Sequence, residues 1–245
     1  MDQENSTRQE ILSNLAKLRW YLTSLYWGGT EYWPAKTETS DGVQHGSCDL
    51  RKPLMRATTS ADPEQILLNT QQELGDCTRC RLHTTRTRIV FGEGSPAAQI
   101  VFVGEGPGYD EDQQGRPFVG RAGKLLDKMI SALGYAREEV YICNMVKCRP
   151  PNNRTPNIEE IDVCSPFLIK QIEAIRPRVI CALGACAAQN LLQLTSPISR
   201  LRGKIHPWRG IPFVATFHPA YLLRNPSQKS AAWQDLLEIQ RLARS

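Results

Sequence analysis

The stretch AAQIVFVGEGPG, residues 97–108, decides the fold. Its apolar run predicts a buried strand over residues 97–105, and three glycines punctuate the loop that follows. Three further apolar segments predict strands at residues 139–147, 177–184 and 210–219. Helical patterns alternate with them, at residues 120–135, 158–176, 185–194 and 230–243. This alternation predicts an α/β fold in which helices cover both faces of a parallel sheet.

Ligands of such sheets bind at the carboxyl ends of the strands, so the loops after residues 104, 143, 183 and 216 are the expected site. The glycine spacing in the first loop differs from a dinucleotide fingerprint, we expect no helix directly after it, and no GK[ST] of a Walker loop follows. Glycines do let a flat ligand approach the backbone. Phe118, in the same polar segment, offers a stacking face, although a core residue that pins the loop is the alternative.

Two polar side chains come at the ends of later strands. Asn144 ends the second strand, where its amide could read a donor and an acceptor on one ligand edge. His218 ends the fourth strand and is therefore expected near Asn144 and the glycine loop.

Composition and charge bound the function class. The chain has 245 residues, of which 41% are hydrophobic and 22% charged, as in ordinary globular proteins. Residues 63–245 hold 23 Lys and Arg against 17 Asp and Glu, a net charge of +6 that permits a polyanionic partner. We find no membrane span and no secretory signal, so we expect a cytoplasmic protein.

The first part of the chain has a different pattern. Residues 7–27 predict an amphipathic helix, and residues 28–62 read as a flexible linker in which we assign no role to His45 or Cys48. We therefore divide the chain into an N-terminal extension, 1–62, and a main domain, 63–245. Packing on the main domain, self-association and docking of a protein partner all remain open for the helix.

The cysteines suggest a metal site in a reducing compartment. A C-x2-C pair precedes the first strand, and two further cysteines flank the start of the second helix; these four are Cys77, Cys80, Cys148 and Cys164. Four thiolates suit either Zn²⁺ or an iron–sulfur cluster. We interpret Cys143, Cys181 and Cys186 as buried packing residues.

Taken together, GEGPGYDED-x2-GRPFVG-x-AG, N-x2-KCRPPNNRTP, the C-x2-C pair and HPAYLLRNP closely resemble the family 4 uracil-DNA glycosylases of bacteria and archaea. The resemblance spans about residues 72–242 and leaves the N-terminal extension outside. It implies a three-layer α/β/α sandwich with a central four-stranded parallel sheet. It also implies a structural 4Fe-4S cluster on Cys77, Cys80, Cys148 and Cys164, and a prokaryotic source.

The resemblance further implies a DNA-repair reaction, hydrolysis of the N-glycosidic bond of deoxyuridine, with free uracil and an abasic site as products. Phe118 would stack on the flipped uracil, Asn144 would pair with its edge, and His218 would donate to uracil O2. The residues that would line the rest of the pocket are Glu105, Gly106, Pro107 and Gly108. Asn153 would position the attacking water, and Glu111 would support the loop.

Contacts to single- or double-stranded DNA would come from the last motif. Leu222 or Leu223 would wedge into the vacated base stack, and Arg224 would contact phosphate. Further basic candidates are Arg116, Lys147, Arg149, Arg154 and Lys204.

A related branch carries an Arg/His-rich insertion after the second strand and stays bound to its product covalently. This sequence lacks the insertion, which favours an enzyme that turns over. Two alternatives stay open: a non-catalytic, metal-containing nucleic-acid-binding module, and a related glycosylase that prefers another deaminated base.

Overall fold

The computed structural model describes residues 62–245. The predicted helix at 7–27, together with His45 and Cys48 of the linker, lies outside the described residues. The division at residue 62 therefore stays a prediction.

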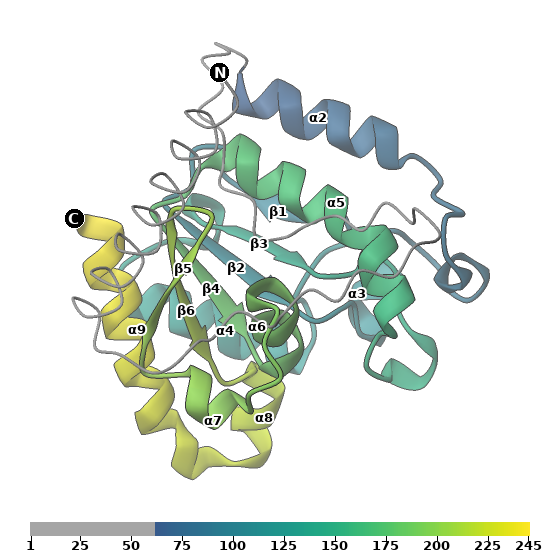
Figure 1. Ribbon diagram of the computed structural model, residues 1–245. Coiled ribbons are helices and arrows are strands. Elements are labelled where there is room, and N and C mark those ends of the chain that lie inside the picture. The colour runs from purple at the N-terminus through teal and green to yellow at the C-terminus, as the bar shows by residue number, and fades with distance from the viewer. Residues whose placement is uncertain (1–61) are drawn as a thin grey trace, which may run out of the picture. The chain divides into compact units, whose positions relative to one another are not determined.

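A single six-stranded sheet organises the described domain, with the strand order β1-β3-β2-β4-β6-β5 (Figure 1). The four central strands run parallel, as predicted, while β1 and β5 pair antiparallel at the two edges. The strands are β1 (Glu93–Gly94), β2 (Ile100–Gly104), β3 (Tyr141–Asn144), β4 (Val179–Leu183), β5 (Ile205–Trp208) and β6 (Ile211–Thr216).

The predicted fold class is confirmed. The prediction of a four-stranded sheet is wrong, because the sheet has two further strands, one at each edge. Strand β1 has only two residues, which is too short for any periodic pattern. Strand β5 contains Pro207, which cannot donate to a ladder and is tolerated at an edge. Neither strand carries the continuous apolar run that reveals the four central ones.

The two faces of the sheet carry separate cores. Along β2, Val101 and Val103 face one core, whereas Ile100 and Phe102 face the other. The first core includes apolar residues of α2, α5 and α6, and the second those of α4, α8 and α9. The helices thus form one layer on each side of the sheet, and Figure 1 shows α2 and α5 running side by side.

The four expected helical segments are present, and the structure adds an unpredicted 12-residue helix at Pro63–Leu74 and several short helices. The α-helices are α2 (Pro63–Leu74), α3 (Tyr109–Gln114), α4 (Arg121–Ala132), α5 (Ile158–Ile175), α6 (Ala185–Leu192), α7 (Ile198–Leu201), α8 (Pro219–Arg224) and α9 (Lys229–Arg244). The 3-10 turns are η1 (Arg81–Thr84), η2 (Arg137–Glu139), η3 (Pro151–Asn153) and η4 (Pro226–Gln228).

Two of the short helices correct an expectation. The glycine-rich loop passes directly into α3, with Gly108 as its N-cap, although we expected no helix there. Similarly, the HPAYLLRNP segment is largely helix α8, with His218 as its N-cap. Both helices therefore begin at the site predicted for chemistry. Within residues 62–245, no helix combines the length and apolarity that crossing a bilayer requires.

Candidate functional site

The parallel strands bring the predicted pocket residues to one edge of the sheet. Gly104 at the end of β2 pairs with Asn144 at the end of β3. Strands β4 and β6 end together at Leu183 and Thr216, two residues before His218. The expected grouping of Gly104, Asn144 and His218 is therefore what the strand register produces.

Asn144 carries an unpaired acceptor in the interior. The residue is 1% exposed, and its Oδ1 is the one buried side-chain nitrogen or oxygen of residues 62–245 without a hydrogen-bond partner. A Cβ on Gly104 would lie 2.4 Å from this oxygen, so a side chain at 104 would close the space beside it. Because a buried unpaired acceptor costs about 1–3 kcal/mol, its presence points to a ligand that donates a hydrogen bond here.

Phe118 supplies a ring next to this acceptor. A Cβ on Gly104 would also lie 2.5 Å from Phe118 Cζ, which places the Phe118 ring and the Asn144 amide around the same point. The ring centroids of Phe118 and His218 are 5.7 Å apart, and the ring planes are tilted by 33°. Phe118 is 6% exposed and has a φ of +51°, in the left-handed region that a phenylalanine rarely occupies. Backbone strain of this kind is concentrated at functional sites.

His218 is held as a neutral donor. Ala220 N donates to His218 Nδ1 over 3.1 Å, so Nδ1 acts as an acceptor and the ring proton resides on Nε2. Burial, helped by the charge of Arg224, lowers the pKa of His218 to about 4. The imidazole is consequently uncharged at neutral pH and offers Nε2–H. Gly184 packs closely against His218, since a Cβ at position 184 would lie 3.0 Å from His218 Cβ.

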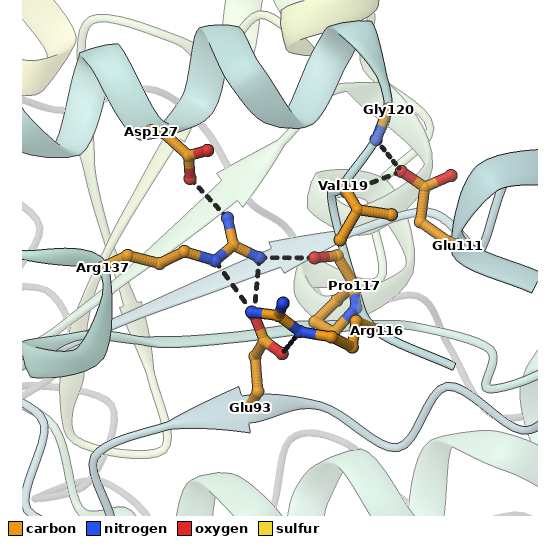
Figure 2. A network of polar contacts seen from close by, with 8 residues as sticks. All are labelled: Glu93, Glu111, Arg116, Pro117, Val119, Gly120, Asp127 and Arg137. Atoms are coloured by element: carbon orange, nitrogen blue, oxygen red, sulfur yellow. Dashed lines mark hydrogen bonds and ion pairs between the residues drawn. The ribbon is translucent and has the colours of Figure 1, made fainter. Parts of the chain in front are cut away.

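Glu111 braces the loop that carries Phe118, as Figure 2 shows. Its Oε1 accepts from Val119 N (2.9 Å) and Gly120 N (3.0 Å). Its Oε2 accepts from Gly108 N at 3.1 Å. The carboxylate therefore ties the glycine-rich loop to the segment after Phe118.

The remaining pocket candidates lie between β2 and α3. Gly106 has no room for a side chain, since a Cβ there would lie 2.8 Å from Val146 Cγ2. Pro107 is buried, whereas Glu105 and Gly108 are half-buried. Burial raises the pKa of Glu105, against hydrogen bonds with Thr155 and Cys186 that lower it.

Asn153 lies in the segment that follows β3. It is exposed on η3, and its Oδ1 accepts a 2.7 Å hydrogen bond from Arg149 Nε. The guanidinium of Arg149 in turn lies over the ring of Tyr109, 5.1 Å from its centroid. This contact links the loop after β3 to α3 at the carboxyl edge of the sheet.

The expected DNA-contacting residues of α8 differ in exposure. Leu222 is 2% exposed and packs into the core with α4 and α9, so it has no surface from which to wedge into DNA. Leu223 is 36% exposed, and Arg224 is also at the surface. Of the two leucines considered, Leu223 is the one that a ligand could reach.

One of the basic candidates is wrong. Lys147 is wholly buried, and its Nζ donates to Asn144 O (3.0 Å) and to Gln171 Oε1 (2.6 Å), so it cannot contact DNA. Its position beside charged neighbours in the sequence gave no sign of this burial. The candidates that do reach the surface are Arg116, Arg149, Arg154 and Lys204.

The four predicted metal-ligating cysteines line one cavity. Its walls contain Cys77, Cys80, Cys148 and Cys164, with apolar residues of α2 and α5 around them. Arg79 Nη1 donates to Cys77 Sγ (3.3 Å), and Arg86 Nη1 to Cys148 Sγ (3.6 Å). Cationic donors of this kind suit thiolates.

These cysteines do not converge on a point. In the described part of the chain, no three His, Cys, Asp or Glu side chains are placed to hold one metal ion. A tetrahedral Zn²⁺ with Zn–S bonds of about 2.3 Å needs such convergence. All four cysteines nevertheless line the same cavity. Cys143 and Cys181 are fully buried in strands, and Cys186 is buried on α6, which confirms that these three lie in the interior.

Comparison with known proteins identifies the family. The profile described as the uracil DNA glycosylase superfamily matches residues 91–237. The chain belongs to this superfamily. It is 51% identical over 168 residues to the type-4 uracil-DNA glycosylase of Thermotoga maritima, which covers 68% of this chain and 88% of that protein.

Further relatives narrow the group within the uracil-DNA glycosylase superfamily. The type-4 uracil-DNA glycosylase of Archaeoglobus fulgidus is 47% identical over 176 residues, which cover 69% of this chain and 88% of that protein. The type-5 uracil-DNA glycosylase of Pyrobaculum aerophilum is 30% identical over 167 residues, which cover 61% and 73%. The resemblance to the family 4 glycosylases is thereby confirmed.

Several residues that shape the site carry no signal in the sequence. Arg137 and Glu93 belong to the network of Figure 2 around the Phe118 loop, and Gly184 supports His218. None of these residues stands in a recognisable motif. A single arginine or glycine in a sequence reveals its role only when its neighbours in space are known.

Proposed function

We propose that this protein is a monofunctional uracil-DNA glycosylase that hydrolyses the N-glycosidic bond of deoxyuridine in DNA. One observation carries the proposal: the unpaired, buried Asn144 Oδ1 lies beside the Phe118 ring at the edge where His218 presents Nε2–H. Uracil matches this arrangement because it is flat and has an N3–H donor between two carbonyl acceptors. Free uracil and an abasic site are the products.

Each of the three side chains has a separate role in the proposal. Phe118 stacks on the flipped uracil, Asn144 pairs with O4 and N3–H, and His218 donates to O2. Negative charge grows on O2 as the bond breaks, and one well-placed donor contributes roughly 3–4 kcal/mol to its stabilisation. The depressed pKa of His218 supports this role, since it keeps Nε2–H as a neutral donor of fixed direction.

Base selection follows from the same groups. Cytosine would present an N3 acceptor to the Asn144 Oδ1 acceptor, which leaves both unpaired. The 5-methyl group of thymine has to be excluded by shape. The loop proposed to line that part of the pocket contains Glu105, Gly106, Pro107 and Gly108.

Water attack needs no strong base in this proposal. Gly106 has no side chain to act as one, so we infer a dissociative path in which the base leaves before water attacks. Positive charge on the sugar is then stabilised by the neighbouring phosphates. Asn153 is proposed to orient the water: its Oδ1 already accepts from Arg149, and a carbonyl oxygen has a second lone pair. Glu111 holds the loop.

DNA binding requires the target nucleotide to leave the base stack, which costs a few kcal/mol. Leu223, exposed on α8, is proposed to fill the vacated space, with Arg224 on a phosphate. Additional phosphate contacts are proposed for Arg116, Arg149, Arg154 and Lys204. The net positive charge of residues 63–245 supports a polyanionic partner.

A structural 4Fe-4S cluster on Cys77, Cys80, Cys148 and Cys164 is the second part of the proposal. The four residues share one cavity, yet they do not converge as ligands of a single ion would. Four thiolates can bind a cluster with one thiolate per iron, and the resemblance to the family 4 glycosylases favours this cluster over zinc. Such a cluster would tie α2 and α5 to the loop after β3, which also carries Asn153. A reducing, cytoplasmic location in a prokaryote is part of the same proposal, supported by the bacterial and archaeal sources of the relatives.

The test is release of the base from an oligonucleotide with one labelled deoxyuridine, using anaerobically purified full-length protein. Chromatographic recovery of free uracil from both U·G and single-stranded substrates is the expected result. Oligonucleotides with hypoxanthine, or with thymine opposite guanine, report whether another base is preferred. Tight DNA binding without release of any base would overturn the proposal in favour of a binding module.

A further inference from the structure

The backbone around Phe118 is held from both sides. Phe118 has a φ of +51°, and Pro117 and Val119 flank it. On the far side, Glu111 accepts from Val119 N and Gly120 N. On the near side, Arg137 Nη2 donates to Pro117 O at 2.5 Å, and Figure 2 shows the two side chains approaching the loop from opposite directions.

Arg137 is itself fixed by two carboxylates. Its Nε and Nη2 donate to Glu93 Oε1 (2.9 and 2.7 Å), and its Nη1 donates to Asp127 Oδ1 (2.5 Å). The side chain is 15% exposed. A guanidinium is planar, so acceptors at all three nitrogens leave it one orientation. Asp127 lies on α4, Glu93 on β1 and Arg137 on η2, so the network ties three elements to the loop.

The ionic state of the network is secure at neutral pH. Burial alone would raise the pKa of Glu93, but hydrogen bonds from Arg116 and Arg137 outweigh it and hold that pKa below its ordinary value. The carboxylate that anchors Arg137 is therefore charged under working conditions.

A further close contact fixes the carbonyl of Phe118. A Cβ on Gly123, in the first turn of α4, would lie 1.9 Å from Phe118 O. The carbonyl of Phe118 consequently rests against the helix backbone, while Arg137 holds the carbonyl before it. Without Arg137, the Pro117–Phe118 peptide unit would lose its one hydrogen bond to a fixed cation and could relax from the left-handed conformation.

We propose that Arg137, anchored by Glu93 and Asp127, is a positioning residue that fixes the Phe118 ring against the flat base of the substrate. It acts through Pro117 O and touches no substrate atom. The inference rests on the proposed function, because it takes Phe118 as the residue on which uracil stacks. Stacking and alignment with His218 depend on where this ring lies, so loosening it lowers base binding and the rate of bond cleavage together.

A double-mutant cycle between Arg137→Gln and Phe118→Ala tests this coupling, with kcat/KM for uracil release as the readout. Arg137→Gln is expected to lower kcat/KM at least tenfold in the wild-type background. In the Phe118→Ala background the same substitution should change it less than twofold, because the ring that Arg137 positions is already gone. Equal losses in both backgrounds would overturn the proposal, as would no loss in the wild-type background.

Two controls separate positioning from general destabilisation. Arg241→Gln removes an arginine that pairs with Glu238 on the exposed side of α9, and Ile239→Val slightly weakens the core under the same helix. Both variants should retain wild-type kcat/KM at a temperature where all the proteins are folded. If Ile239→Val lost as much activity as Arg137→Gln, stability alone would explain the effect and the proposal would fail.

A measurement without DNA distinguishes this inference from the proposed function. 4-Fluorophenylalanine placed at position 118 gives a ¹⁹F resonance that senses the His218 ring 5.7 Å away. We expect one sharp resonance in the otherwise wild-type protein and a shifted or broadened one in Arg137→Gln. An unchanged resonance would overturn the positioning role even if uracil release were demonstrated. Conversely, a changed resonance in a protein that releases no uracil would refute the proposed function and leave the positioning contact intact.

Discussion

Gly104 and Asn144 are partners in the parallel ladder, and the missing side chain of one makes room for the amide of the other. A Cβ on Gly104 would lie 2.4 Å from Asn144 Oδ1 and 2.5 Å from Phe118 Cζ. The absence of one methyl group therefore lets the Asn144 amide and the Phe118 ring pack directly against Gly104. This relationship defines the proposed base pocket more directly than any motif.

Gly104→Ala should disrupt that pocket. The added methyl group displaces the Asn144 amide or the Phe118 ring, and overpacking of this kind costs about 1–3 kcal/mol of stability. We expect uracil release to fall roughly 100-fold, a loss of about 2.7 kcal/mol in transition-state stabilisation. Gly203→Ala is the control: nothing lies within 4 Å of its added methyl group, and its φ of +72° makes it a backbone-strained glycine substitution outside the pocket. Equal activity of the two variants would refute this description of the pocket.

Asn144→Ala should lower activity strongly while changing the free energy of unfolding little. The variant removes the unpaired Oδ1, so the stability lost with the side-chain contacts is partly offset by the removal of a costly buried acceptor. We expect kcat/KM for uracil to fall roughly 100-fold while the free energy of unfolding changes by less than about 1 kcal/mol. Asn190→Ala, at an asparagine whose Nδ2 donates to Cys186 O on α6, should leave kcat/KM unchanged. A large loss of stability in Asn144→Ala would show that Oδ1 has a partner in the folded protein.

The stability of the protein should depend on pH through His218. Its pKa is about 4 in the folded protein, against 6.5 for an ordinary histidine. Below pH 6.5 the unfolded chain binds a proton at this position and the folded protein does not, so stability falls as the pH drops from 6.5 towards 4. The full difference corresponds to about 3 kcal/mol.

Urea unfolding under anaerobic conditions at pH 7 and pH 4.5 measures this effect. The wild type should lose about 2–3 kcal/mol more than His218→Gln over that interval. Parallel losses in the two proteins would contradict the depressed pKa of His218.

The proposed cluster ligands can be tested without an activity assay. Cys148→Ser and Cys164→Ser should lose the iron, sulfide and visible absorption of a 4Fe-4S cluster. Cys143→Ala and Cys181→Ala should keep them, because these fully buried cysteines lie in strands away from the shared cavity. Stoichiometric zinc in place of iron in the wild-type protein would contradict the proposed cofactor.

Particular residues show how far the sequence alone predicts the structure. The four central strands were predictable because each is a continuous apolar run, and parallel order then brought Gly104, Asn144 and His218 to one edge. Helices α3 and α8 were missed because each spans only six residues and follows Gly108 or His218, in segments dominated by turn formers.

Side-chain burial was harder to predict than the strands. The basic segment around Lys147 suggested a surface, whereas the side chain turns inward to Gln171 and the backbone of Asn144. Likewise, Leu222 and Leu223 are adjacent in sequence, and only the helical phase of α8 decides that the first is buried and the second exposed. The Arg137 network had no sequence signature, since its contacts join residues on three separate elements.

The most direct test of the account compares His218→Ala with His206→Ala in single-turnover release of uracil. His206 lies on edge strand β5, where its Nε2 contacts Leu201 O, so the control removes an imidazole from outside the pocket. If His218 Nε2–H stabilises the negative charge on uracil O2, its loss should slow the reaction roughly 10²–10³-fold while His206→Ala retains the wild-type rate. A folded, cluster-loaded His218→Ala protein that releases uracil as fast as the wild type would contradict the central claim.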